Sequence, residues 1–107
     1  MAQSEIIELV KKYCLSLSSF GIPVTKAYLY GSWARNEANE NSDIDVMVVS
    51  PIFDKHNDLM KAKAWRATEK IDLRIEPYTV SSQKFLNDDV SPLLQVVKRE
   101  GIEILLK

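Results

Sequence analysis

The sequence predicts an α/β fold of the α+β kind, in which helices flank a small mixed β-sheet. Segments with helical spacing of apolar residues alternate along the chain with short apolar segments typical of strands. Glycine, proline and serine stand at the borders between these segments, where turns and helix caps are expected. A length of 107 residues is that of one domain with a buried core, so we expect a single domain over residues 1–107.

Residues 4–20 carry apolar side chains on one helical stripe, and they predict a first helix. Ser4 is a candidate cap for its start and Gly21 marks its end. The apolar segment 24–30 follows and predicts a strand, which the glycine at position 31 interrupts.

Residues 32–38 predict a short helix or turn, and a polar loop follows them. Residues 43–49 predict a second strand, because their apolar run is too short for a helix. Residues 54–70 predict a helix, for which we expect five inward-facing side chains: Leu59, Met60, Ala62, Ala64 and Trp65.

Residues 71–75 predict a third strand that stops before Pro77. A short turn capped by Ser81 or Ser82 should follow. Proline after serine at 91–92 predicts the start of a helix that runs to about residue 100. Residues 102–106 then predict a final edge strand.

Composition excludes several classes of protein. The 14 basic and 15 acidic residues leave a net charge of −1, which argues against general binding to nucleic acid. Cys14 is the single cysteine, so no internal disulfide can form. No basic start followed by an apolar run is present, and no apolar run approaches the roughly 18 residues that span a membrane. We therefore expect a cytoplasmic protein that does not enter a membrane.

Gly31 and Ser32 stand between a predicted strand and a predicted helix. Glycine lets a ligand approach the backbone, and the free amides of a helix start favour anions such as phosphates. Ser32 adds a hydroxyl donor. The alternative is an ordinary strand-to-helix turn in which Ser32 serves only as an N-cap.

Asp43 and Asp45 open the second predicted strand. Side chains at i and i+2 of a strand share one face, with Cα atoms about 6.6 Å apart. Two such carboxylates can hold one magnesium or manganese ion, or bridge two. The alternative is a charged strand entrance solvated by water, and the following apolar run does not fit a calcium loop.

The combination of a strand, Gly-Ser, ten residues and Asp-x-Asp is far more specific than either part, and it favours nucleotide binding. With Ala34-Arg35 it resembles the minimal nucleotidyltransferases of the DNA-polymerase-β superfamily. The resemblance covers almost the whole chain. It departs from the family at Asn36, where glycine is usual; asparagine would tolerate a positive φ there.

This resemblance implies roles for particular residues. Gly31, Ser32 and Arg35 would bind the nucleotide, and Asp43 and Asp45 would bind two Mg²⁺ ions. Asp72 is expected as the third carboxylate, helping one metal and accepting a proton, with Glu76 as its rival on the same strand face. Arg74 could pair with either acid or touch a phosphate.

The resemblance also implies an activity and a partner. The expected function is Mg²⁺-dependent transfer of AMP from ATP to a hydroxyl of a HEPN-type toxin, with this chain as antitoxin. Two alternatives stay open: a binding module that neutralises its partner by occlusion, and an enzyme that modifies a small molecule. The acceptor, the preferred nucleotide and the choice between a hetero- and a homo-oligomer are left undetermined.

Other residues carry weaker signals. Trp33 could stack on a base or pack under the sheet, and Trp65 is expected in the core. A basic face on the helix at 54–70 is either solvated or in contact with a phosphate or partner; it consists of Lys61, Lys63, Arg66 and Lys70.

Overall fold

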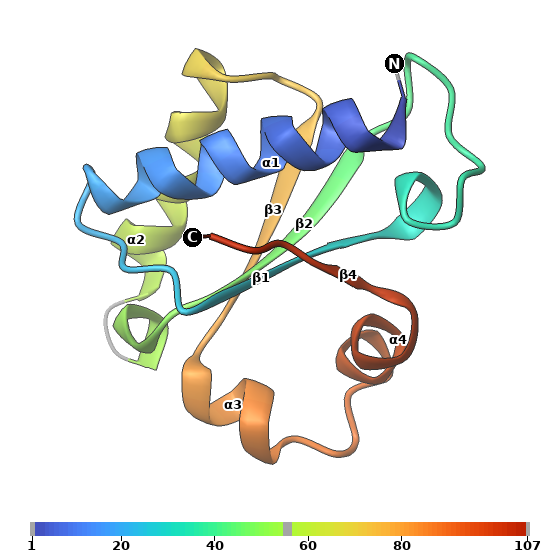
Figure 1. Cartoon of the computed structure of the whole chain (residues 1–107). Helices are drawn as coiled ribbons and strands as arrows, with labels where there is room; N and C mark the ends of the chain where they lie inside the picture. The colour runs from blue at the N-terminus through green and yellow to red at the C-terminus, as the bar shows by residue number, and fades with distance from the viewer. Residues whose placement is uncertain (1, 55–56, 107) are drawn as a thin grey trace.

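A mixed β-sheet lies at the centre of the fold (Figure 1). The computed structural model describes residues 2–54 and 57–106. Within them the sheet has four strands in the order β3-β2-β1-β4, formed by β1 (Lys26–Tyr30), β2 (Ile44–Val49), β3 (Ile75–Val80) and β4 (Ile102–Glu103). β1 pairs antiparallel with β2 and β4, whereas β2 and β3 are parallel. The predicted mixed sheet with flanking helices is confirmed.

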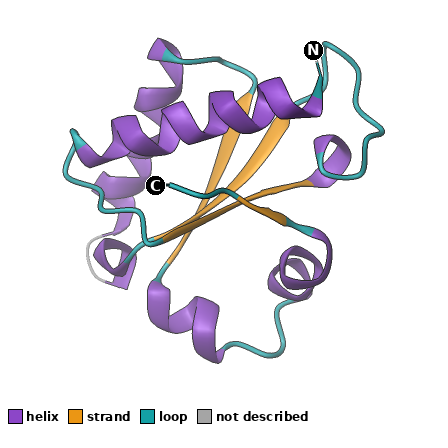
Figure 2. Cartoon of the chain, viewed as in Figure 1, coloured by secondary structure: helices purple, strands orange, loops and turns teal. Residues whose placement is uncertain are grey.

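Two helices, α1 (Gln3–Ser18) and α2 (Asn57–Ala67), cover one face of the sheet (Figures 1 and 2). Alternate strand residues point into this layer and join the stripe of α1 in one buried cluster, which includes Ile6, Val10, Leu17, Leu29, Ile44, Val46, Val48 and Ile75. The buried Tyr13 hydroxyl donates a hydrogen bond of 2.7 Å to the Ala64 carbonyl, which ties α1 to α2. Burial of each large side chain contributes roughly 1.5–3 kcal/mol to stability.

The opposite face of the sheet packs on α3 (Ser82–Asn87) and α4 (Pro92–Glu100). The intervening strand residues point into this second cluster, which consists of Met47, Val49, Val80, Phe85, Leu94 and Val97. The Tyr28 ring stacks on the Phe85 ring at a centroid distance of 5.3 Å. Ser81 and Ser91 cap the two helices through their side-chain oxygens, as predicted.

The predicted helix over 54–70 is divided into η2 (Pro51–Asp54), α2 and η3 (Thr68–Lys70), a set of two 3₁₀ turns and one α-helix. Ala64 is buried as expected. Trp65 is 47% exposed, Leu59 is 60% exposed and Ala62 is exposed as well, so the prediction that these three side chains face inward was wrong. Ser4 lies inside α1, whose N-cap residue is Ala2.

The third strand begins four residues later than predicted and runs through Pro77. β3 is an edge strand, and a proline whose missing N–H would point away from the sheet costs no ladder hydrogen bond. Residues 71–74 form the turn that precedes this strand. This shift decides which acidic side chain of the segment faces the site.

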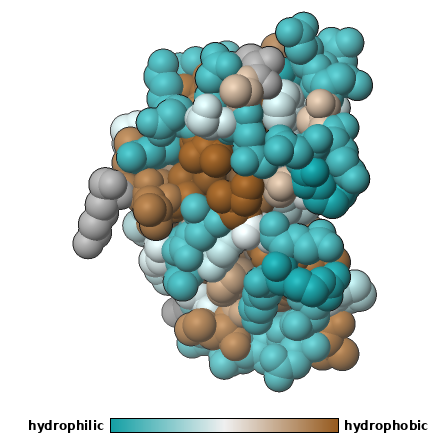
Figure 3. Space-filling model, turned by 45° about the vertical axis from the view of Figure 1, so that its right-hand side comes forward, coloured by the Kyte–Doolittle hydropathy of each residue, from teal (hydrophilic) through white to brown (hydrophobic). Residues whose placement is uncertain are grey.

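The surface seen in Figure 3 is mainly hydrophilic, with its largest hydrophobic area near the middle and smaller ones toward the lower end. Among residues 2–54 and 57–106, no helix has the length and apolarity needed to cross a bilayer.

Candidate active site

Three neighbouring strands place Tyr30, Asp45 and Glu76 in one row across the sheet. Tyr30 on β1 is the pairing partner of Asp45 on β2, and Asp45 is the partner of Glu76 on β3. Directly paired residues share a face, so the three side chains lie on the α3–α4 side of the sheet. The turn at Gly31 follows Tyr30 directly and brings the Gly-Ser motif to the β1 end of this row.

The backbone at Gly31 requires glycine for two reasons. Its φ is +76°, a conformation that disfavours residues with a Cβ atom. A Cβ atom built there would overlap Asp45 Oδ2 and lie 3.2 Å from Asp45 Cγ. The Asp45 carboxylate therefore packs directly against the glycine backbone, so the Gly-Ser turn and the Asp-x-Asp motif are parts of one site.

The carboxyl groups of Asp43, Asp45 and Glu76 interact with one another. Asp43 stands at the entrance of β2, and its carboxyl group lies within hydrogen-bonding reach of that of Glu76, which raises the Glu76 pKa above its usual value. Burial, and then the charge of Asp43, raise the pKa of Asp45. Three acidic groups held this close repel one another when ionised, and a bound cation would relieve that repulsion.

Hard oxygen donors of this kind suit magnesium or manganese. In the side-chain positions of the described residues, no three acidic, histidine or cysteine side chains converge in a geometry ready to hold a metal ion. The oxygen atoms of Asp43, Asp45 and Glu76 are therefore suitable ligands for such an ion. To bind it, the three carboxylates would have to rotate so that they point toward one common position.

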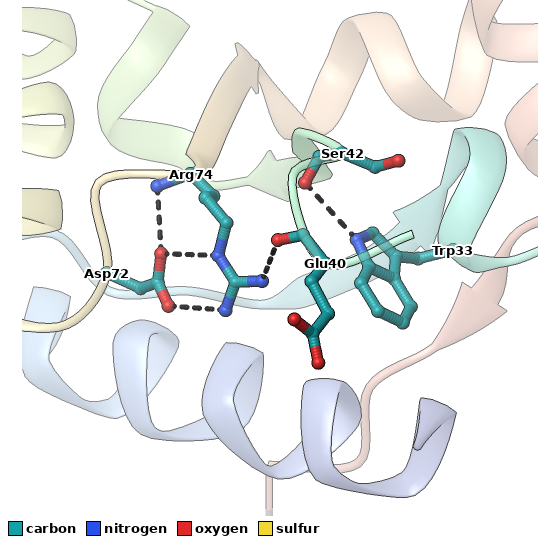
Figure 4. Close-up of polar contacts among 5 residues, drawn as sticks. All are labelled: Trp33, Glu40, Ser42, Asp72 and Arg74. Carbon is teal, nitrogen blue, oxygen red and sulfur yellow. Dashed lines mark hydrogen bonds and ion pairs between the residues drawn. The ribbon is translucent and has the colours of Figure 1, made fainter. Parts of the chain in front are cut away.

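The Asp72 carboxylate forms an ion pair with Arg74 (Figure 4). Its carboxylate accepts hydrogen bonds from Arg74 Nε at 3.0 Å and from Arg74 Nη2 at 2.7 Å, and the guanidinium lowers the pKa of Asp72. Both residues lie in the turn before β3, so Asp72 does not share the strand face of Glu76. Of the two acids that the sequence offered as third carboxylate, the structure brings Glu76 to Asp43 and Asp45 and pairs Asp72 with Arg74.

Two hydrogen bonds hold the carboxyl-terminal part of the loop between the two motifs (Figure 4). Arg74 Nη1 donates a 2.9 Å hydrogen bond to the Glu40 carbonyl, and Trp33 Nε1 donates one of 3.4 Å to the Ser42 carbonyl. The Trp33 side chain is buried, which removes it from stacking on a base. Asn36 has a φ of +60°, in agreement with its expected tolerance of that conformation. The two hydrogen bonds to Glu40 and Ser42 therefore hold the backbone directly before Asp43.

Ser32 and Arg35 complete the predicted set. Ser32 lies within η1 (Gly31–Trp33), whose N-cap residue is Tyr30, so it is not a simple N-cap. Arg35 is exposed, and its Nε donates a 2.7 Å hydrogen bond to Glu37. Its positive charge also acts on Asp45, which places it on the same side of the molecule as the carboxylates.

Tyr30 was not singled out from the sequence. Burial, followed by the charge of Asp45, raises its pKa to about 12. In the sequence, its position directly before Gly31 was the one indication that Tyr30 lies near the site. The pairing of β1 with β2 shows that Tyr30 lies beside Asp45.

The raised carboxyl pKa values predict the direction of one pH effect. Because their pKa values are raised, Asp45 and Glu76 bind protons more tightly in the native state than in the unfolded state. Their contribution therefore makes the native state less stable, relative to the unfolded state, as pH rises through and above about 4. We expect metal-free Asp45→Asn to melt at a higher temperature than wild type at pH 7, by a few degrees. The difference should shrink toward pH 4 in thermal unfolding followed by circular dichroism. An equal difference at both pH values would contradict this prediction.

Comparison with known proteins agrees with this geometry. The profile of the family described as nucleotidyltransferase domain matches residues 7–107. Among solved structures, one from Sulfolobus solfataricus, described as a nucleotidyltransferase, has a TM-score of 0.64 and 19% identity over 94% of this chain and 80% of that chain. A toxin–antitoxin structure with AMP-PNP has a TM-score of 0.63 and 20% identity over 91% and 73%. A search of curated proteins finds no match. Since the family profile spans nearly all of the sequence, the chain belongs to the nucleotidyltransferase domain family and is a transferase of that kind.

Proposed function

We propose that the chain transfers AMP from ATP to a hydroxyl group of a HEPN-type partner protein, with magnesium as the cofactor, and so acts as an antitoxin. The observation that carries the proposal is the meeting of Asp43, Asp45 and Glu76 directly beside the Gly31 turn. The antitoxin role is supported by the similarity of fold to a toxin–antitoxin structure with AMP-PNP.

Each residue of the site would have its own role in binding the nucleotide or the metal ions. Gly31 and Ser32 bind the triphosphate, with Arg35 close enough to attract its charge. Asp43, Asp45 and Glu76 hold two magnesium ions, and we assign the third carboxylate to Glu76 in place of Asp72. Bound magnesium would neutralise charge that gathers on the phosphates during transfer.

The reaction balances without a further reactant. The acceptor oxygen forms a bond to the α-phosphorus, the bond from that phosphorus to the oxygen bridging to the β-phosphate breaks, and pyrophosphate leaves. The hydroxyl proton would pass to Glu76, the carboxylate at the β3 end of the row. Most of the rate enhancement would come from positioning and from charge stabilisation.

The test is transfer of label from ATP labelled at the α-phosphate, with magnesium and the product of the neighbouring gene as acceptor. Wild type should label the partner, and Asp43→Ala/Asp45→Ala should not. Absence of label from both, with a stable complex still formed, would replace the proposal with neutralisation by occlusion. Label on a small molecule alone would exclude the protein acceptor.

A further inference from the structure

A groove of about 590 Å³ runs along the outer edge of β3, on the side of Glu76 away from the Gly31 turn. One wall comes from η2 and α2, and the other comes from α3. None of the residues assigned to nucleotide or metal binding lines it. The groove is therefore a second concave surface beside the site already described.

The side chains of the groove combine aromatic surface with positive charge. Trp65 is 47% exposed and Tyr78 is 40% exposed, and both line the groove. Among the described residues that line the groove, Lys61 on α2 and Lys84 on α3 carry positive charge, and Asp54 carries negative charge. Exposed aromatic rings next to ammonium groups suit a ligand with an aromatic side chain and negative charge.

The edge of β3 that borders the groove is poorly suited to pairing with an added strand. Arg74 and Val80 direct their carbonyls to Ile44 and Ser50, so alternate residues of β3 point their backbone toward β2. Pro77 and Thr79 consequently face outward, and Pro77 has no N–H to offer to an added strand. Binding must therefore depend on the rings and the lysines.

The position of the groove relative to the carboxylates suggests its role. Pro77, the residue directly after Glu76, is the first residue of β3 that lines the groove, and Tyr78 follows on the same strand face as Glu76. The triphosphate turn lies at the β1 end of the row, and the groove lies past its β3 end. The carboxylates stand between the two, as a donor and an acceptor on opposite sides would require.

We propose that this groove binds a short acidic, hydroxyl-bearing segment of the protein acceptor, an inference that rests on the proposed function. The small size of the groove, its own carboxylate at Asp54 and the chain's net charge of −1 favour a peptide segment over a nucleic acid. The half-exposed Trp65, which the sequence assigned to the core, then has a reason to face solvent.

The test uses a fluorescein-labelled peptide of the composition Asp-Glu-Tyr-Glu-Asp, measured by anisotropy without nucleotide. We expect wild type to bind it, and Lys61→Glu/Lys84→Glu and Trp65→Ala each to weaken binding about tenfold or more. The matched control Lys12→Glu/Arg66→Glu reverses two exposed charges outside the groove, one of them also on α2, and should bind like wild type. Circular dichroism confirms that each variant is folded.

Several outcomes would overturn the inference. Equal weakening in the control would make the effect one of net charge, and absence of peptide binding by wild type would remove the site. Preferential binding of an oligouridylate that depends on Lys61 and Lys84 would assign the groove to RNA. A rise in the KM for ATP in Trp65→Ala would assign it to the nucleotide. Because the peptide assay needs no turnover, it gives an answer even if label transfer fails.

Discussion

Glu76→Gln is expected to lower nucleotide transfer by about 10³-fold or more while leaving the fold intact. The substitution keeps the size of the side chain and removes the charge that would bind metal and accept the proton. It also removes one of three repelling acids, so the metal-free variant should be at least as stable as wild type at neutral pH. Label transfer, together with the shift of melting temperature on addition of Mg²⁺, measures both effects.

Asp72→Asn is the matched control. It breaks the ion pair with Arg74 and should lower the free energy of unfolding by about 1 kcal/mol. It should retain the stabilisation by Mg²⁺ that Glu76→Gln loses, because Asp72 does not face the other carboxylates. The reverse result, with Mg²⁺ stabilisation lost in Asp72→Asn and kept in Glu76→Gln, would return the third carboxylate to Asp72.

Gly31→Ala should affect both stability and activity. Alanine at a φ of +76° costs about 1–2 kcal/mol, and its Cβ atom would overlap Asp45 Oδ2. The Asp45 carboxylate must then move, and a displacement of about 1 Å in a catalytic group can lower the rate about 10²-fold. Urea unfolding and label transfer would separate the two effects.

Gly21→Ala isolates the contribution of the contact with Asp45. Gly21 has a similar φ of +83°, but nothing lies within 4 Å of an added Cβ atom. It should show the same loss of about 1–2 kcal/mol from backbone strain and no loss of activity. If Gly31→Ala keeps full activity as well, the Asp45 carboxylate does not need the position that the structure gives it.

Local patterns in the sequence predicted most of the elements. The apolar stripe of α1, the short apolar runs of β1 and β2, and the Ser-Pro start of α4 are signals that neighbouring residues carry among themselves. The Gly-Ser and Asp-x-Asp motifs predicted the site for the same reason, since their spacing is read along one stretch of chain. The resemblance to a family with glycine at this position indicated that Asn36 could adopt a positive φ, and its φ is +60°.

Pairing between distant segments decided the rest. Whether Asp72 or Glu76 joins the site depends on where β3 begins and on its register against β2, which pairs Glu76 with Asp45. Trp65 lines the groove along the edge of β3 and lies outside the buried core, so it stays half exposed. By itself the sequence predicted the family, most of the elements and the candidate carboxylates Asp43 and Asp45, because these predictions depend on local spacing. Only the tertiary structure brought Glu76, and not Asp72, to Asp43 and Asp45 and formed the groove beside it, because both depend on contacts between residues far apart in the chain.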